Sequence, residues 1–174
     1  MDDVLPVGPE WRPIAFGVII RQTGKVPWSL RRDRTADFDE ITRRAAARGM
    51  PPVRYPDGWP VQTYSIIALR AALFVSDQLE RRALSQELFR AAFVDGRHLA
   101  DLDTVLHAAA DAGLDAEAVR AGIERQEVKD ALRAQTDDAV SRGVTGVPTV
   151  AVGEALFWGD DRLEDAAAAL AHER

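Results

Sequence analysis

The sequence contains no cysteine among its 174 residues. This absence excludes disulfide bonds within the chain, thiolate metal sites, a cysteine nucleophile and a Cys-x-x-Cys redox pair. Histidine is also scarce, and His98, His107 and His172 do not have the spacing of metal ligands. We therefore expect neither a metal centre nor cysteine chemistry in this chain.

Long apolar runs and an excess of positive charge are absent as well. Arg70 interrupts the longest apolar stretch, so no segment reaches the roughly 18 residues that a membrane-spanning helix needs. No segment has the pattern of a secretory signal peptide. The formal net charge of −6 is opposite in sign to that of a typical nucleic-acid-binding protein. These absences predict a cytoplasmic protein that binds neither membranes nor nucleic acids.

Charge is unevenly distributed along the chain. Between Arg12 and Arg54 there are ten basic and four acidic residues, so this part carries a charge of +6 and the remainder carries −12. A basic N-terminal third can attract an anionic ligand. A solvated basic surface explains the same composition equally well, and both interpretations stay open.

The apolar content of 47% is that of an ordinary globular core, and its periodicity is mainly helical. Apolar spacing and capping residues predict helices over residues 35–49, 64–75, 80–94, 101–112, 115–126, 127–142 and 160–171. Thr35, Asp101 and Asp115 are the expected N-caps. The helix over 64–75 is apolar on several sides, which indicates a central position in a helical bundle.

The N-terminal third contains one further predicted element. Glu10 to Phe16 alternates and is rich in aromatic and β-branched residues, which predicts a strand in spite of Pro13. The pattern of Gly17 to Gln22 fits a continuation of that strand or one helical turn.

The stretch from Gly143 to Leu163 carries the most informative pattern. A long helical pattern ends at Gly143, and a new helix is expected at the Asp160-Asp161 pair. Between them, two short β runs flank a Gly153-Glu154 turn and predict a hairpin of strands Thr149–Val152 and Ala155–Trp158.

Pro148 precedes the first of these strands, where a proline cannot donate a ladder hydrogen bond. We predict a cis peptide bond between Val147 and Pro148, which would turn the chain and expose the backbone of Val147. Exposed backbone N–H and C=O groups can pair with an extended peptide ligand, as an added strand does.

Two motifs in this stretch resemble a known family. Gly-Val-x-Gly-Val-Pro-Thr at 143–149, followed by Leu-Phe-Trp-Gly-x-Asp-Arg-Leu at 156–163, resembles the C-terminal signature of 2-hydroxychromene-2-carboxylate isomerases. These enzymes belong with kappa-class glutathione transferases in the DsbA-like thioredoxin-fold group. The resemblance implies an α/β, thioredoxin-like fold with a large all-helical insertion. Residues 1–29 and 141–174 would form the thioredoxin-like domain, and residues 30–140 the helical insertion domain.

The N-terminus departs from the family pattern. Relatives begin with a strand that ends in Asp-Phe-x-Ser-Pro, or in Cys-Pro-x-Cys in the redox branch, and a helix follows. We find no counterpart of that strand, its reactive residue or that helix ahead of Trp11. The thioredoxin-like fold is therefore expected to be incomplete at the N-terminus, and the catalytic residue stays unknown. Strand edges left unpaired in this way favour a homodimer.

The resemblance implies a set of ligand-facing residues. Val147 and Pro148 would pair with the cysteinyl backbone of glutathione or another low-molecular-weight thiol. Asp160 and Asp161 would hold its γ-glutamyl amino group, although Asp161 and Glu164 also fit a capping box for the last helix.

Three further residues complete the set. Arg34 lies near the position of a lysine that contacts the glycine carboxylate in kappa-type proteins, and a cation there suits a carboxylate. Lys25 stands where relatives often have Asn, so this contact has changed. Trp158 would pack structurally or stack on the substrate.

By resemblance, the expected function is thiol-dependent cis–trans isomerisation, with a small-molecule thiol and an aromatic-derived acid as partners. The chain could be inactive by itself, because no thiolate-activating residue can be named. Two alternatives stay open. One is a DsbA-like thiol-disulfide oxidoreductase that lost its Cys-Pro-x-Cys segment, and the other is a non-catalytic dimeric binding module.

Overall fold

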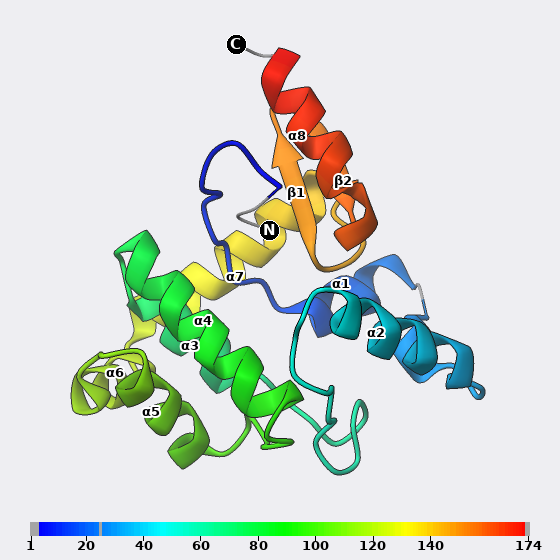
Figure 1. Ribbon diagram of the computed structural model, residues 1–174. Coiled ribbons are helices and arrows are strands. Elements are labelled where there is room, and N and C mark those ends of the chain that lie inside the picture. The colour runs from blue at the N-terminus through cyan, green and yellow to red at the C-terminus, as the bar shows by residue number, and fades with distance from the viewer. Residues whose placement is uncertain (1–3, 25, 173–174) are drawn as a thin grey trace. The chain divides into compact units, whose positions relative to one another are not determined.

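The computed structural model describes residues 4–24 and 26–172, apart from the side chain of Trp28 (Figure 1). Its α-helices are α1 (Phe16–Thr23), α2 (Thr35–Ala47), α3 (Ile66–Phe74), α4 (Gln78–Phe93), α5 (Leu102–Asp111), α6 (Ala116–Gly122), α7 (Gln126–Ser141) and α8 (Leu163–His172). Two short 3-10 helices, η1 (Trp28–Leu30) and η2 (Asp160–Arg162), and two strands, β1 (Thr149–Val152) and β2 (Ala155–Trp158), complete the elements. No helix in the described part of the chain is long and apolar enough to span a membrane.

The chain divides into two compact units. The first combines Met1–Lys25 with Arg133–Arg174, and the second is Val26–Leu132. The α7 helix contributes residues to both units, and each unit has a hydrophobic cluster of its own. The domain bounds predicted from the sequence put both junctions a few residues further along the chain, and they stay a prediction.

Four helices, α3 to α6, enclose the core of the Val26–Leu132 unit. The α3 helix contacts α4, α5 and α6, which confirms its predicted central position. Ala71 of α3, Leu84 of α4 and Val105 of α5 are fully buried in this core. Burying a side chain such as Leu84 contributes about 2 kcal/mol to stability, so these contacts hold the four helices together.

Aspartates cap three of these helices. Asp77, Asp101 and Asp115 each accept hydrogen bonds from backbone N–H groups in the first turns of α4, α5 and α6. The predictions for Asp101 and Asp115 are thereby confirmed. Each cap satisfies N–H groups that the helix cannot, and contributes about 1 kcal/mol.

The start of α2 differs from its prediction. Thr35 was expected to cap this helix, but its N-cap is Arg34 and no side chain caps it there. The N–H of Thr35 instead donates to Asp33 Oδ1 at 3.0 Å. The carboxylate of Asp33 thus takes over the local role that the hydroxyl of Thr35 was expected to have.

The other unit contains the hairpin. Strands β1 and β2 pair antiparallel within the predicted bounds, with Thr149 opposite Trp158 and Val152 opposite Ala155. The α8 helix packs on this hairpin (Figure 1), and Ala166 on α8 is buried together with Val152 and Leu5. Within the described residues, each strand has only the other as its neighbour.

The strand predicted at Glu10–Phe16 is wrong. Residues 10–15 are irregular and α1 begins at Phe16, so the helical alternative for Gly17 to Gln22 holds. Side chains of α7 satisfy the segment in place of a neighbouring strand. Gln135 Nε2 donates to the carbonyl of Pro13 at 2.6 Å, and the N–H of Ala15 donates to Thr136 Oγ1 at 3.0 Å.

The predicted α/β class is confirmed in part, with a smaller sheet than expected. Helices predominate, and the sheet formed by the described residues has two strands instead of the three that the sequence suggested. The physical reason is the one above: the backbone of the first expected strand is bonded to helix side chains.

Candidate functional site

The loop between α7 and β1, residues 142–148, forms the centre of the candidate site and is called the cis-proline loop below. The long helix ends as predicted, because Gly143 adopts a φ of 86° that favours glycine. The Val147–Pro148 peptide bond is cis, which confirms that prediction. Thr149 Oγ1 donates to the carbonyl of Gly146 at 2.8 Å, so the first residue of β1 holds the loop in place.

Val147 presents backbone groups that have no hydrogen-bond partner in the described part of the chain. Among the described residues, no hydrogen bond involves the backbone N–H or C=O of Val147. The residue is 44% exposed, and Pro148 beside it is exposed too. An N–H donor and a C=O acceptor on one exposed residue are what an extended peptide needs for pairing as an added strand.

Trp158 forms one wall of the site. Its indole lies so close to Gly146 that any Cβ at that position would overlap the ring, and Gly146 is buried. Trp158 is nevertheless 59% exposed. The side chain therefore packs on the cis-proline loop and leaves aromatic surface open to solvent, and stacking on a substrate stays a prediction.

The start of η2 is attached to the cis-proline loop through the backbone. The N–H of Gly159 donates to the carbonyl of Pro148 at 3.0 Å, and Gly159 adopts a φ of 105°. Asp160 and Asp161 follow directly. The hydrogen bond brings this acidic pair next to Pro148, although eleven residues of hairpin separate them in the sequence.

The two aspartates differ in their surroundings. Asp161 is exposed, and its side chain lies close to Gly159. Asp160 is half-buried and makes an interaction within the protein. The start of η2 has no side-chain cap, and no hydrogen bond joins Asp161 to Glu164 in the described part of the chain. The capping box therefore does not account for Asp161.

Arg162 has a structural role beside this pair. Its guanidinium forms an ion pair with Asp165 and lies 5.9 Å from the centre of the Phe157 ring. These contacts connect η2, β2 and the first turn of α8. They hold the segment that carries Asp160 and Asp161 against the hairpin.

Two predicted site residues, Arg34 and Lys25, stay predictions. Arg34 belongs to the Val26–Leu132 unit, where it donates to the carbonyl of Ser29 at 2.9 Å and lies 5.3 Å from the centre of the Phe38 ring. Lys25 lies outside the described residues. The structure thus brings together Val147, Pro148, Trp158 and the two aspartates.

Sequence reasoning missed the part played by Gly146. The only signal in the sequence was the glycine itself, and the structure adds that its φ is not positive, so no left-handed turn requires it. A glycine of that kind indicates a close approach by another group, here the indole of Trp158. Which group approaches cannot be read from local pattern, since it comes from the far end of the hairpin.

The chain matches a family model over most of its length. The model describes a DSBA-like thioredoxin domain and matches residues 10–171. A solved structure of 2-hydroxychromene-2-carboxylate isomerase has the same fold, with a TM-score of 0.75, 20% identity, and coverage of 92% of this chain and 78% of that chain.

One relative adds sequence similarity. The 2-hydroxychromene-2-carboxylate isomerase of Sphingobium xenophagum is 27% identical over 121 residues, which is 70% of this chain. The alignment covers 60% of that relative's length. Because the family model extends over nearly the whole chain, the protein belongs to the DSBA-like thioredoxin domain family and is a distant homologue of 2-hydroxychromene-2-carboxylate isomerase.

Proposed function

We propose that this chain binds glutathione or a similar low-molecular-weight thiol at the cis-proline loop and acts in thiol-dependent cis–trans isomerisation of an aromatic-derived acid. The observation that carries the proposal is the unused backbone N–H and C=O of Val147, held next to an acidic pair. The distant homology supports isomerisation as the reaction type, because the relative is named as a 2-hydroxychromene-2-carboxylate isomerase.

The residues fit a thiol tripeptide in two ways. The backbone of Val147 can pair with the amide groups of the cysteinyl residue, much as a strand pairs with its neighbour. The carboxylates of Asp160 and Asp161 can accept hydrogen bonds from a γ-glutamyl ammonium group. The Gly159–Pro148 hydrogen bond joins the residues next to both sets of groups, so the two sets are near enough for one ligand to contact both.

Binding and chemistry are separate tasks at this site. When bound, the thiol supplies a nucleophilic sulfur that can add reversibly to a conjugated double bond and so permit rotation about it. The chain's own residues orient the thiol and provide an apolar wall at Trp158 for an aromatic substrate. None of the residues named here activates the sulfur, so the catalytic residue stays unassigned.

The same experiments also distinguish two alternative functions. A thiol-disulfide oxidoreductase needs a cysteine pair, and these 174 residues contain none. A non-catalytic module, including a homodimer joined through free strand edges, would bind the thiol without turning over a substrate.

Calorimetric titration of the full chain with glutathione tests the binding step. The affinity for S-methylglutathione should be within a few-fold of that for glutathione, because the proposed contacts are made to the backbone and amino groups of the ligand and not to its sulfur. A glutathione analogue without the γ-glutamyl amino group should bind about ten-fold more weakly, since it loses the charged contacts to the aspartates. Failure of glutathione and of S-methylglutathione to bind would refute the proposed site.

Variants locate the site within the chain. Asp160→Asn together with Asp161→Asn should weaken glutathione by about ten-fold. Glu154→Gln, which removes an exposed carboxylate from the turn of the same hairpin, should not change the affinity. Absorbance of 2-hydroxychromene-2-carboxylate, followed with and without glutathione, then separates an isomerase from a module that only binds.

A further inference from the structure

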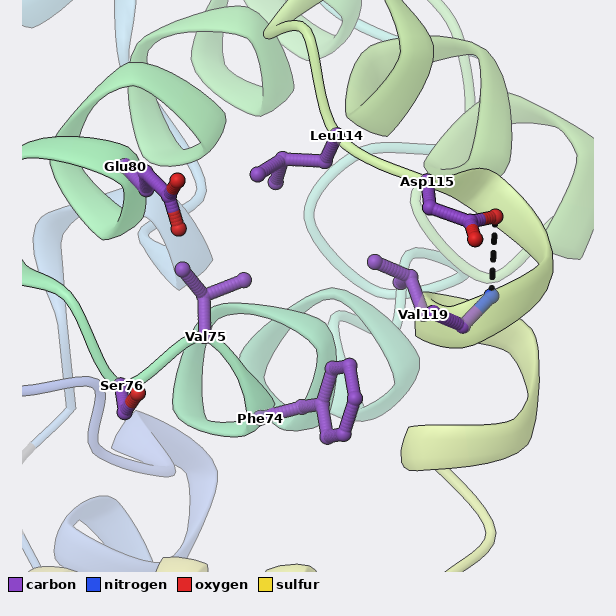
Figure 2. Close-up of a pocket in the computed structure, with 8 residues that line it drawn as sticks. Phe74, Val75, Ser76, Glu80, Leu114, Asp115 and Val119 are labelled. Carbon is purple, nitrogen blue, oxygen red and sulfur yellow. Dashed lines mark hydrogen bonds between the residues drawn. The ribbon is translucent and has the colours of Figure 1, made fainter.

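The Val26–Leu132 unit has a cavity that the proposed function does not use. This cavity of about 250 Å³ opens where the end of α3 meets the starts of α4 and α6 (Figure 2). Its lining consists of Phe74, Val75, Ser76, Glu80, Leu114, Asp115, Ala118 and Val119.

The floor of this cavity is apolar and firmly held. Val119 is 2% exposed and Val75 is 6% exposed. The Phe74 ring packs directly on Gly122, and the Arg125 guanidinium lies 5.2 Å from the ring centre. A floor built from side chains that are packed on more than one side is preorganised, so a ligand need not order it.

A buried arginine holds the end of α3, which carries Phe74 and Val75 of the cavity lining. Arg81 is 8% exposed, and its Nε donates to the carbonyls of Ala72 and Val75 at 3.0 Å each. The Arg81 guanidinium therefore binds backbone carbonyls at the end of α3. No basic residue belongs to the cavity lining.

The opening of the cavity carries two carboxylates. Figure 2 shows Glu80 on the α4 side and Asp115 on the α6 side, with Val75 and Leu114 between them. Asp115 Oδ1 accepts the N–H groups of Glu117 at 2.9 Å and Ala118 at 3.2 Å, which caps α6. Within the described residues, the Glu80 carboxylate has no hydrogen bond or ion pair, so it can accept a new donor.

We propose that this cavity binds a small primary ammonium compound with an aromatic or branched apolar body. The apolar body would occupy the floor between Phe74 and Val119, and the ammonium would donate to Glu80 at the opening. The volume suits this class, since a cavity of roughly 150 Å³ accommodates a benzene ring and the remaining space suits a short alkyl chain. An anion of the same shape is disfavoured, because two carboxylates would repel it.

NMR titration of the full chain with 2-phenylethylamine tests the proposal. The amide signals of Val75, Ala118 and Val119 should shift in a saturable way. The anion 3-phenylpropanoate, which has a similar body and the opposite charge, should bind at least about ten-fold more weakly.

Two variants and one control assign the binding to this cavity. Glu80→Gln should weaken 2-phenylethylamine by about three-fold, because it removes a partly solvated charge partner. Ala118→Leu should abolish binding, since the larger side chain occupies the cavity. Glu117→Gln changes an exposed carboxylate on α6 that pairs with Arg120 at 3.4 Å and is no part of the lining, so it should leave the affinity unchanged.

Several outcomes would overturn the proposal. These are the absence of saturable shifts, an equal affinity for the amine and the anion, or unchanged binding of the amine in both Glu80→Gln and Ala118→Leu. None of them bears on glutathione binding at the cis-proline loop, which is measured with a different ligand and different variants.

Discussion

Gly146 is buried against the indole of Trp158, and no side chain fits between its backbone and the ring. The hydrogen bond from Thr149 Oγ1 to the Gly146 carbonyl holds the same residue from the other end of the loop. A single glycine thereby lets the aromatic wall and the backbone of Val147 lie next to each other.

Gly146→Ala should destabilise the protein by about 1–3 kcal/mol, because the added methyl group must displace the indole or the loop. It should also weaken glutathione binding, since Val147 moves with the loop. Urea unfolding and calorimetric titration measure the two effects.

Gly17→Ala is the matched control. Gly17 lies in α1, its φ is not positive, and an added Cβ meets nothing within 4 Å. Alanine there should be neutral or stabilise by up to about 1 kcal/mol, because it is the better helix former. Equal stabilities of the two variants would show that the contact between Gly146 and Trp158 is not formed.

At the scale of an element, α2 is stabilised by its own charges. Glu40 accepts hydrogen bonds from Arg43 at 2.9 and 2.8 Å and from Arg44 at 2.8 Å. The hydrogen bonds from Arg43, and next those from Arg44, lower the pKa of Glu40 from 4.5 to about 2. The pairs are one turn apart on the helix surface, which is the spacing that lets such side chains meet.

The lowered pKa of Glu40 predicts a pH dependence. Since the folded-state pKa lies below the unfolded one, the stabilisation is fully present above about pH 4.5 and is lost as the pH falls towards about 2. NMR titration of the Glu40 carboxyl carbon should give a midpoint near 2. In the double variant Arg43→Met and Arg44→Met, the midpoint should move up towards 4.5. A midpoint that both proteins share would contradict the pairing.

At the scale of the whole molecule, the two units have separate cores. Leu5 is 6% exposed and is buried with Val152 and Ala166 in one cluster, whereas Leu84 is fully buried in the other. Because the buried contacts of each cluster lie within one unit, the units can lose their structure locally and independently.

Leu5→Ala and Leu84→Ala should therefore have regional effects. Each truncation should cost about 2–4 kcal/mol, through lost apolar burial and the cavity that remains. Hydrogen exchange followed by mass spectrometry should show faster exchange mainly in the hairpin and α8 for Leu5→Ala, and mainly in α3 to α6 for Leu84→Ala. Uniformly faster exchange in both variants would mean that the chain unfolds as one cooperative unit.

Features that depend on neighbouring residues were well predicted. The hairpin strands Thr149–Val152 and Ala155–Trp158, the cis bond before Pro148 and the caps at Asp101 and Asp115 were all found where expected. Each depends on chemistry within a few residues, such as a two-residue turn, a proline or a carboxylate beside free N–H groups.

Features that depend on distant residues were missed. The strand predicted over 10–16 failed because Gln135 and Thr136 of α7 satisfy its backbone. Equally, nothing local to Gly146 indicates which ring lies against it, and nothing local to Phe74 indicates a cavity bounded by Asp115.

The sequence by itself therefore determined the family, the helical periodicity and the residue types of the candidate site, because these depend on local pattern and motif. Only the tertiary structure decided that the Gly159–Pro148 hydrogen bond brings Asp160 and Asp161 next to Val147, and that Trp158 covers Gly146. It also decided that α3, α4 and α6 leave an acidic-rimmed cavity between them. The physical reason is that these contacts join residues far apart in the chain, and their energies exist only once the chain has folded.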